Sequence, residues 1–293
     1  MDLKKEFLVK PDSKTKLADI DPAAPGSYTE ESANAELAKH KETISALQRR
    51  LNAEGTRAML IVLQGIDTAG KDGTIWHVIN SMDPEGVRVT GFKVPTEEEL
   101  AHDFLWRVHA RAPGKGEIAV FNRSHYEDVL VARIHKLVPK KIWNARYDFI
   151  NEWEKLLTID NNTTILKFFL YISKDEQLRR FKQRLDDPER QWKISEADYK
   201  EREYWDDYID AFEDMFANCS KGFAPWFIIP SNDKWFRNLA VAKIIADTLE
   251  DINPKYPPPK VNLDQIRRLY HTAVKDGEEN SNTNGNSAKK KHL

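Results

Sequence analysis

The stretch from Met59 to Ile75, MLIVLQGIDTAGKDGTI, constrains the fold of this chain more than any other. An apolar segment runs directly into a glycine-containing loop, and the loop runs into a sequence that favours a helix. Gly65, Gly70 and Lys71 match the spacing G-x-x-x-x-G-K. In that motif, backbone N–H groups turn toward one anion and the lysine reaches its outer oxygens. The pattern therefore predicts a phosphate-binding P-loop between a buried strand and a helix.

Two carboxylates distinguish this loop from an ordinary P-loop. Asp72 stands where Ser or Thr usually binds magnesium, and Asp67 lies within the loop itself. A carboxylate beside polyanionic phosphate is repulsive unless a divalent cation lies between them or the carboxylate takes a proton, so Asp67 predicts metal-assisted chemistry. The phosphate-binding residues of the loop are expected to be Gly65, Thr68, Ala69, Gly70, Asp72 and Gly73. The alternative is a surface glycine turn, which the flanking strand and helix disfavour.

A second dense polar cluster, NRSHYED, follows the third predicted strand, Glu117 to Phe121. P-loop enzymes hold a second metal ligand at the end of such a strand. The first candidate here is the amide of Asn122, so Glu127 is the candidate that supplies the missing negative charge. Arg123 is expected to face the phosphates. The predicted metal ligands are therefore Asp67, Asn122 and Glu127, and together with Lys71 and Arg123 they form the predicted catalytic set.

Basic side chains at other positions are further candidates for binding phosphate. Lys93 follows the short predicted strand Val87 to Phe92, and ligands of open α/β sheets bind at such strand ends. The run RRFKQRLDDPERQWK breaks at Pro188 and predicts a helical hairpin, at about residues 179–195, that closes as a lid over phosphate. The expected phosphate-binding residues outside the P-loop are Lys93, Arg107, Arg133, Arg179, Arg180 and Arg184. The alternative for the run is a solvated charged helix.

The order of elements predicts a doubly wound, five-stranded parallel sheet, because four further strands alternate with helices after the P-loop. The segment 93–117 is expected to supply one long helix between two of these strands. With 293 residues and 40% hydrophobic content, the chain can build one such domain with a sizeable core. The predicted organisation is an N-terminal arm at 1–32, a P-loop phosphotransferase domain at 33–270 and a disordered tail at 271–293.

Composition argues against several classes of partner. The formal net charge of −2 gives no sign of a nucleic-acid coat or of a membrane-surface protein. The longest apolar stretches are far too short to span a bilayer. The single Cys219 excludes an internal disulfide, and no charged-then-apolar leader opens the chain. We therefore expect a cytoplasmic protein that binds neither nucleic acid nor membrane.

Three blocks, GIDTAGKDG, GFKVPTEEELAHDFLWR and FNRSHYEDVL, stand in this order and resemble the polyphosphate kinase 2 family over about Leu51 to Asn253. The resemblance implies a P-loop kinase-like fold similar to thymidylate kinase and phosphate transfer between inorganic polyphosphate and nucleotides. It also implies that Asp67 and Lys71 are the P-loop carboxylate and lysine, with Asn122 and Arg123 in the second motif. Members that favour nucleoside diphosphates usually have Asp at the position of Asn122. The FNRSHYED form looks like the subgroup that phosphorylates both AMP and ADP.

The resemblance implies a mechanism and a set of ligands. Polyphosphate would occupy the P-loop channel as donor, and AMP or ADP would accept its terminal phosphate directly, giving ADP or ATP, with GMP and GDP as further acceptors. In-line transfer of this kind needs positioning and charge neutralisation more than a general base. Mg²⁺, or Mn²⁺ in its place, is the expected cofactor, and a homo-oligomer (dimer or tetramer) is expected. Two alternatives remain: a P-loop kinase that uses ATP on a small acceptor, and a non-catalytic polyphosphate-binding protein.

Overall fold

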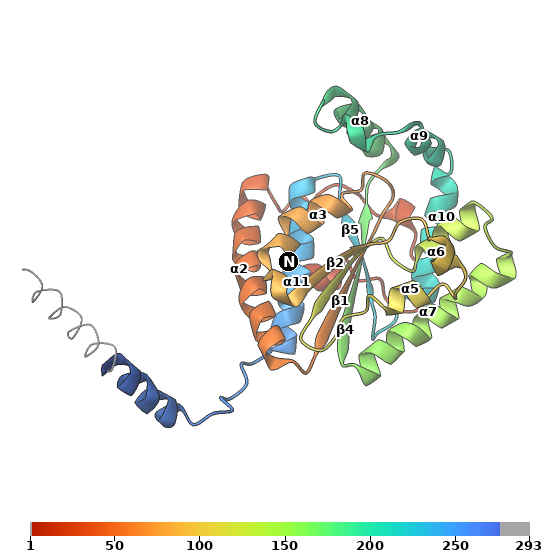
Figure 1. The fold of residues 1–293 in the computed structure, drawn as a ribbon. Coiled ribbons are helices and arrows are strands. Elements are labelled where there is room, and N and C mark those ends of the chain that lie inside the picture. Colours follow the sequence, from red (N-terminus) through yellow and green to blue (C-terminus); the bar gives the residue numbers. More distant parts are fainter. Residues whose placement is uncertain (1, 276–293) are drawn as a thin grey trace, which may run out of the picture. The chain divides into compact units, whose positions relative to one another are not determined.

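The computed structural model describes residues 2–275, and the chain divides into two units between Lys255 and Tyr256. The first unit is built on a five-stranded sheet in the order β2-β3-β1-β4-β5 (Figure 1). Its strands are β1 (Ala58–Gln64), β2 (Val87–Gly91), β3 (Ile118–Asn122), β4 (Thr163–Tyr171) and β5 (Trp226–Pro230). All neighbouring strands are parallel. The predicted doubly wound sheet is confirmed.

Strand β1 lies at the centre of the sheet, and every one of its residues is buried. Because successive side chains of a strand point to opposite faces, alternate residues of β1 enter two different cores. Met59, Ile61 and Leu63 belong to one hydrophobic cluster, whereas Leu60 and Val62 belong to the other. The continuous apolar run that the sequence shows is therefore explained by burial on both faces.

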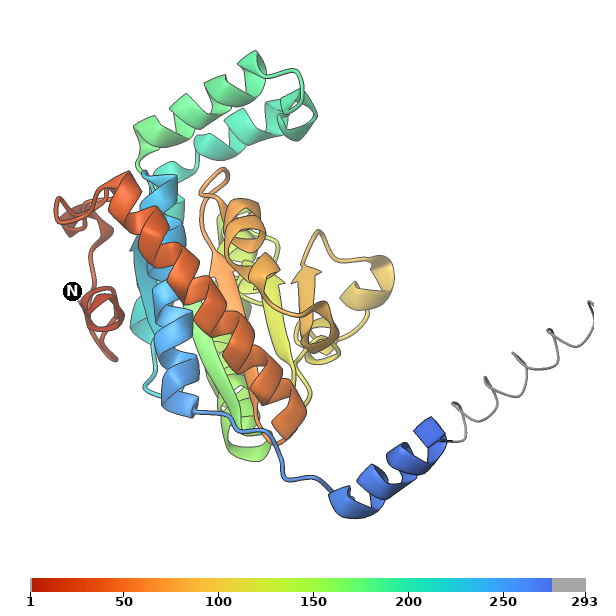
Figure 2. The same cartoon turned by 90° about the vertical axis from the view of Figure 1, so that its left-hand side faces the viewer.

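Helices cover both faces of the sheet (Figures 1 and 2). One core contains residues of α2 (Glu30–Glu54) and α11 (Lys234–Ile252), and α3 (Lys71–His77) follows the P-loop on this side. The other core contains residues of α6 (Glu127–Ile134), α7 (Lys140–Asp160) and α10 (Trp205–Cys219). The P-loop and the NRSHYED cluster follow the adjacent strands β1 and β3, so both lie at the carboxyl edge of the sheet.

The predicted long helix over 93–117 is wrong. The structure has two short helices there, α4 (Glu97–Leu100) and α5 (Trp106–His109). Thr96 caps α4 in a capping box with Glu99, and the carboxylate of Asp103 accepts a hydrogen bond from the N–H of Leu105 over 2.9 Å. Such local side-chain bonds to the backbone compete with helix propagation, which explains the interruption.

The segment 2–28, which we call the arm, lies along the edge of strand β5. It contains α1 (Leu3–Glu6) and the 3₁₀ turn η1 (Leu17–Asp19). Leu8 forms an antiparallel bridge with Phe227, and the N–H of Val9 donates to Trp226 O over 2.9 Å. Leu3 and Leu17 are fully buried, so the arm is part of the packed unit.

A helical hairpin stands at one end of the first unit, where the sequence predicts a lid (Figure 2). It consists of α8 (Lys174–Asp186), the 3₁₀ turn η4 (Gln191–Lys193) and α9 (Glu196–Arg202), and we call it the lid hairpin. The remaining 3₁₀ turns, η2 (Ile79–Ser81) and η3 (Pro84–Gly86), link α3 to β2.

In the second unit, residues 263–275 are helical, so this helix includes the first five residues of the predicted disordered tail. The rest of that predicted tail, 276–293, lies outside the described residues. Within residues 2–275, no helix combines the length and apolar character needed to cross a membrane.

Candidate active site

Two residues of the P-loop, Thr68 and Gly70, have φ in the left-handed region. Gly70 has φ +110°, and a Cβ there would lie 1.8 Å from Nη1 of Arg237, so only glycine fits this position. Lys71 is 8% exposed, and its Nζ donates to Gly65 O over 2.6 Å. Burial and then the charge of Arg123 lower the pKa of Lys71 to about 8. The lysine thus rests on a backbone carbonyl of its own loop, beside the space that a phosphate would enter.

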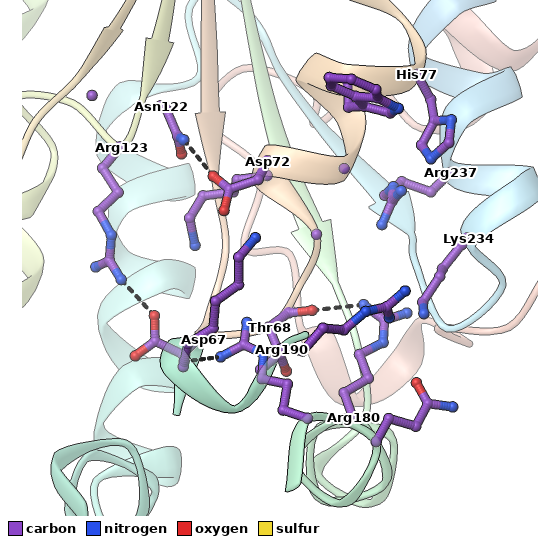
Figure 3. Close-up of a pocket in the computed structure, with 18 of the residues that line it drawn as sticks. Asp67, Thr68, Asp72, His77, Asn122, Arg123, Arg180, Arg190, Lys234 and Arg237 are labelled. Atoms are coloured by element: carbon purple, nitrogen blue, oxygen red, sulfur yellow. Dashed lines mark hydrogen bonds and ion pairs between the residues drawn. The ribbon is translucent and has the colours of Figure 1, made fainter. Parts of the chain in front are cut away.

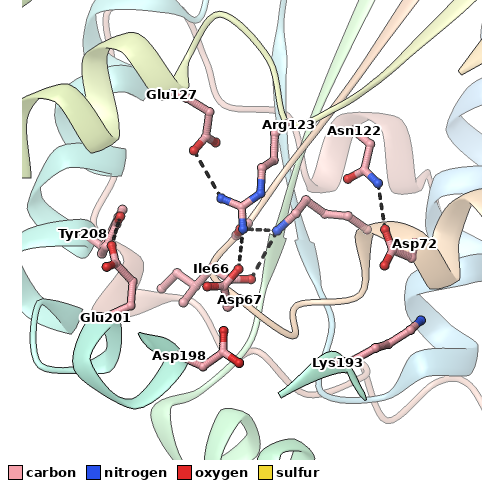
Figure 4. Close-up of polar contacts among 12 residues, drawn as sticks. Ile66, Asp67, Asp72, Asn122, Arg123, Glu127, Lys193, Asp198, Glu201 and Tyr208 are labelled. Carbon is pink, nitrogen blue, oxygen red and sulfur yellow. Dashed lines mark hydrogen bonds and ion pairs between the residues drawn. The ribbon is translucent and has the colours of Figure 1, made fainter. Parts of the chain in front are cut away.

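Arg123 joins the two sequence motifs. Its Nη2 donates to Asp67 Oδ1 over 2.5 Å, and its Nη1 donates to Glu127 Oε2 over 3.2 Å (Figure 4). Burial lowers the pKa of Arg123, but the carboxylates of Glu127 and Asp67 raise it above its usual value, so the guanidinium stays charged. Arg123 has φ +61°, in the left-handed region. Residues outside glycine hold that conformation only where their surroundings enforce it, and such positions concentrate at functional sites.

Asn122 pairs with Asp72 and not with the other predicted metal ligands. Its Nδ2 donates to Asp72 Oδ1 over 2.7 Å (Figure 3). Asp67 and Glu127 are instead separated by the guanidinium of Arg123. Among residues 2–275, no three His, Cys, Asp or Glu side chains are grouped as a metal site would require. The predicted ligands are therefore divided between two neighbouring pairs.

Two cavities meet at these motifs. The main cavity has a volume of about 910 Å³, and the side cavity has a volume of about 210 Å³. The sequence-predicted residues that line the main cavity are Asp67, Thr68, Gly70, Lys71, Asp72, Gly73, Lys93, Asn122, Arg123, Arg180 and Arg184. Gly65 and Glu127 line the side cavity. Asp67 and Arg123 line both, so they stand where a group bound in one cavity would meet a group bound in the other.

Four predicted phosphate-binding residues line neither cavity. The side chain of Ala69, a residue of the P-loop, is fully buried. The three others are arginines bonded to the protein: Arg107 to Lys93 O (2.9 Å), Arg133 to Asp214 (2.6 Å) and Arg179 to Glu176 (2.6 Å). Arg107 thus contacts the backbone of Lys93 without lining the main cavity itself, whereas Lys93 does line it.

Four cationic side chains and one histidine of the main cavity were not predicted from the sequence. Lys234 and Arg237 lie in the first turn of α11, and His77 ends α3; Figure 3 shows these three on the side of the cavity opposite Asp67 and Arg123. Arg190 and Lys193 of the lid hairpin also line it. One sequence feature could have indicated Lys234 and Arg237. They begin the helix that follows the last strand, and α/β sheets bind ligands at the carboxyl ends of their strands.

Arg237 is a buried cation without a carboxylate contact among the described residues. It is 2% exposed, and its Nε and Nη2 donate only to the amide Oδ1 of Asn238. Burial and then the charge of Arg180 lower the pKa of Arg237 to about 9. Burial also lowers the pKa of Lys234, followed by the charges of Arg180 and Arg190. Because neither cation forms an ion pair with a carboxylate within residues 2–275, this wall of the cavity is suited to a strongly anionic ligand.

A buried network of charged and polar side chains holds the NRSHYED cluster in place. Nζ of Lys167, in β4, donates to Glu154 Oε2 over 2.6 Å and to Tyr126 Oη over 2.8 Å. Tyr126 Oη in turn donates to Glu154 Oε1 over 2.8 Å, and His125 Nε2 lies 3.3 Å from the same oxygen. All four side chains are fully buried. They connect the turn that carries Arg123 to α7 and to the sheet.

Residues 27–257 match the family model described as Polyphosphate kinase 2 (PPK2). The chain belongs to the PPK2 family. The family resemblance predicted from the three sequence blocks is thereby confirmed.

Two curated relatives and one solved PPK2 structure extend the match to nearly the whole chain. The AMP/ADP-polyphosphate phosphotransferase of Meiothermus ruber is 46% identical over 264 residues, which cover 89% of this chain and 98% of the relative. The ADP-polyphosphate phosphotransferase of Rhodopseudomonas palustris is 45% identical, covering 74% of this chain and 78% of the relative. The crystal structure of polyphosphate kinase 2 from Arthrobacter aurescens TC1 superposes with a TM-score of 0.85 at 40% identity. It covers 90% of this chain and 98% of that one, so the PPK2 fold extends through both cores.

Proposed function

We propose that this PPK2 chain transfers the terminal phosphate of inorganic polyphosphate to AMP or ADP, with GMP and GDP as further acceptors. The observation that carries the proposal is the cationic wall of the main cavity, in which Lys234 and Arg237 face the P-loop without a carboxylate counter-charge among the described residues. A long polyanion supplies the missing charge. The names of the relatives support the same substrates, because they pair polyphosphate with AMP and ADP.

The two cavities support separate positions for donor and acceptor. In this proposal, polyphosphate lies along the main cavity, over the P-loop and toward Arg237. The acceptor nucleotide brings its terminal phosphate to Asp67 and Arg123, which line both cavities.

The proposed transfer is a direct displacement. An oxygen of the acceptor's terminal phosphate attacks the end phosphorus of the polyphosphate. A new P–O bond forms as the bridging P–O bond breaks, and the shortened polyphosphate leaves with the electron pair. The Nζ of Lys71 moves from Gly65 O to an oxygen of the transferred group, and Arg123 neutralises charge on the same group. These residues orient the reactants and stabilise charge that develops in the transition state.

Magnesium, or manganese in its place, fits the oxygen donors of the site. Asp67 and Asp72 both present carboxylates to the main cavity, and magnesium typically binds through one or two carboxylates together with substrate phosphates. We propose Asp67 as the first ligand, with Asn122 and Glu127 as further candidates. A bound Mg²⁺ would neutralise charge between the phosphates. The role of the protein would be to hold the carboxylate oxygens of Asp67 and Asp72 beside Lys71.

An assay of donor and acceptor choice tests the proposal. The purified protein is incubated with long-chain polyphosphate and with AMP, ADP, GMP or GDP, with magnesium and with EDTA. The expected result is ADP from AMP and ATP from ADP, only with metal. Transfer from ATP to a small acceptor but not from polyphosphate would favour the alternative kinase. Polyphosphate binding without transfer, weakened by magnesium, would favour a binding protein.

The last part of the proposal concerns the localisation, oligomeric state and partners of the protein. We propose a cytoplasmic homo-oligomer, dimer or tetramer, whose partners are polyphosphate and the nucleotides AMP, ADP and ATP, with no part for nucleic acid or membrane. Light scattering coupled to size-exclusion chromatography tests the oligomeric state, and a monomer at all concentrations would contradict that part alone.

A further inference from the structure

Side chains of α8 bind three successive backbone carbonyls of the P-loop. Gln177 Nε2 donates to Asp67 O over 3.1 Å. Arg180 Nη1 donates to Thr68 O over 2.8 Å and to Ala69 O over 3.0 Å. These partners lie more than a hundred residues apart in the sequence. The first turns of the lid hairpin are therefore bonded directly to the loop that holds the donor.

Arg180 has no N–H group left for a substrate in this conformation. A guanidinium has five N–H groups. Besides the two bonds to the P-loop, Nε donates to Glu176 Oε1, and Nη2 donates to Ser231 O and to Asn232 O. The side chain is 5% exposed. This differs from the sequence-based expectation that Arg180 binds phosphate.

The P-loop needs these bonds for a physical reason. Its N–H groups can face an anion only if its carbonyls point away, and buried carbonyls without a donor are costly. Thr68 has φ +67°, in the left-handed region, which is unfavourable for a residue with a side chain. The buried Oγ1 of Thr68 has no hydrogen-bond partner among the described residues, so this side chain does not fix the loop itself. Arg180 is the group that holds the Thr68 carbonyl outward.

The same part of α8 also fixes the lid hairpin. Arg202 of α9 donates to the side-chain Oε1 of Gln177 over 2.8 Å and to Lys174 O over 2.7 Å. Farther out, Arg184 Nη1 donates to Lys193 O over 2.9 Å. Gln177 thus accepts a bond from α9 through one atom of its amide and donates to the P-loop through the other. A change in the P-loop carbonyls reaches both helices of the hairpin.

We propose that Arg180 is a positioning residue that keeps the P-loop carbonyls turned away from the donor and couples the loop to the lid hairpin. It acts through the P-loop and does not touch the transferred phosphate. The inference rests on the proposed function for its substrate, and it adds that donor binding in the P-loop and closure of the lid hairpin are one linked event.

Three variants test the role of Arg180. Arg180→Met keeps an unbranched side chain and removes all the donors of Arg180, while Arg180→Lys keeps the charge without the planar fork that reaches acceptors on two sides. Arg179→Met is the matched control, because Arg179 lies beside Arg180, is half exposed and bonds only Glu176. We expect both Arg180 variants to lower kcat/KM for polyphosphate about 100-fold, as misplacement of a site by about 1 Å can do, with the KM for AMP unchanged.

Hydrogen exchange measures the coupling without turnover. Tripolyphosphate is added without acceptor, and exchange is followed in peptides covering 65–75 and 184–203. In the wild type and in Arg179→Met, both segments should become protected. In Arg180→Met, protection of the P-loop segment should weaken and the hairpin segment should no longer respond.

The outcomes separate this inference from the proposed function. If Arg180→Met and Arg180→Lys match Arg179→Met in kcat/KM and in exchange, the inference is overturned. It is equally overturned if both variants lose cooperative unfolding, because Arg180 is then a residue of general stability. A wild-type enzyme that does not use polyphosphate would contradict the proposed function, and the exchange experiment would still report whether the P-loop and the hairpin are linked.

Discussion

Replacing Asn122 by Asp would set two carboxylates within hydrogen-bonding distance, because Asn122 Nδ2 now donates to Asp72 Oδ1 over 2.7 Å. Two unit charges about 4 Å apart repel by about 1 kcal/mol in water and about 4 kcal/mol at an effective dielectric constant of 20. The pair is exposed to solvent, so the cost lies toward the lower value. Loss of the hydrogen bond adds about 1 kcal/mol.

Asn122→Asp is therefore expected to lower kcat/KM for AMP relative to ADP. ADP carries an additional phosphate that brings magnesium with it, and the metal can neutralise the added carboxylate, whereas AMP brings less charge and less metal. The expected change in selectivity is about 1.4 to 2.7 kcal/mol, or roughly 10- to 100-fold. Initial rates with both acceptors over a series of magnesium concentrations measure it, and added magnesium should partly restore activity with AMP.

A double variant provides the matched control. Asn122→Asp together with Asp72→Asn exchanges the two partners and keeps both the net charge and the hydrogen bond. Selectivity should return toward the wild-type ratio. The reasoning is refuted if Asn122→Asp leaves the AMP to ADP ratio unchanged, or if the double variant remains as altered as the single one.

Three further changes test other parts of the molecule. Lys71→Met should keep the fold but lower turnover about 100-fold or more, because a donor to the transferred group is lost; thermal melts and initial rates check this, and near-normal turnover would contradict the P-loop assignment. Arg237→Met should raise the KM for long-chain polyphosphate and not that for AMP, whereas Lys243→Met on the same helix should change neither. Glu154→Gln should lower the unfolding free energy at pH 7 by about 3–5 kcal/mol, because it leaves the buried charge of Lys167 without its partner. Burial raises the pKa of Glu154, but the charge of Lys167 and the contacts with His125 together outweigh burial and hold the pKa below 4.5. The difference in unfolding free energy between the wild type and Glu154→Gln should thus be complete above pH 4.5 and shrink as the pH falls through the lowered pKa of Glu154. Urea unfolding at several pH values measures this difference.

The sequence could predict the features that depend on neighbouring residues. The P-loop, strand β1 and the NRSHYED cluster each consist of a local pattern, and their meeting follows from the rule that parallel strands share a carboxyl edge. Asp67, Lys71 and Arg123 were found in this way, and the structure brings them together.

The remaining features depend on contacts between distant parts of the chain. Arg180 resembles any arginine of a charged helix until its partners, Thr68 and Ser231, are known. Arg237 carries no motif, and its significance comes from burial against Gly70 without a carboxylate contact in the part of the chain that the structure describes. The division of the metal candidates into two pairs follows from the direction in which Arg123 points, and residue order does not specify that direction.

The arm along β5 has a consequence for handling the protein. The last strand of a sheet presents unpaired N–H and C=O groups, which recruit strands from other molecules and start aggregation. Here Ile228 N donates to Phe7 O, and Val9 N donates to Trp226 O, each over 2.9 Å. The arm therefore occupies the hydrogen-bonding positions that a foreign strand would take. A chain shortened to begin at α2 would still contain every residue of the P-loop. It would, however, expose the unpaired edge of β5 to other protein molecules, and we expect it to aggregate more readily than the full chain.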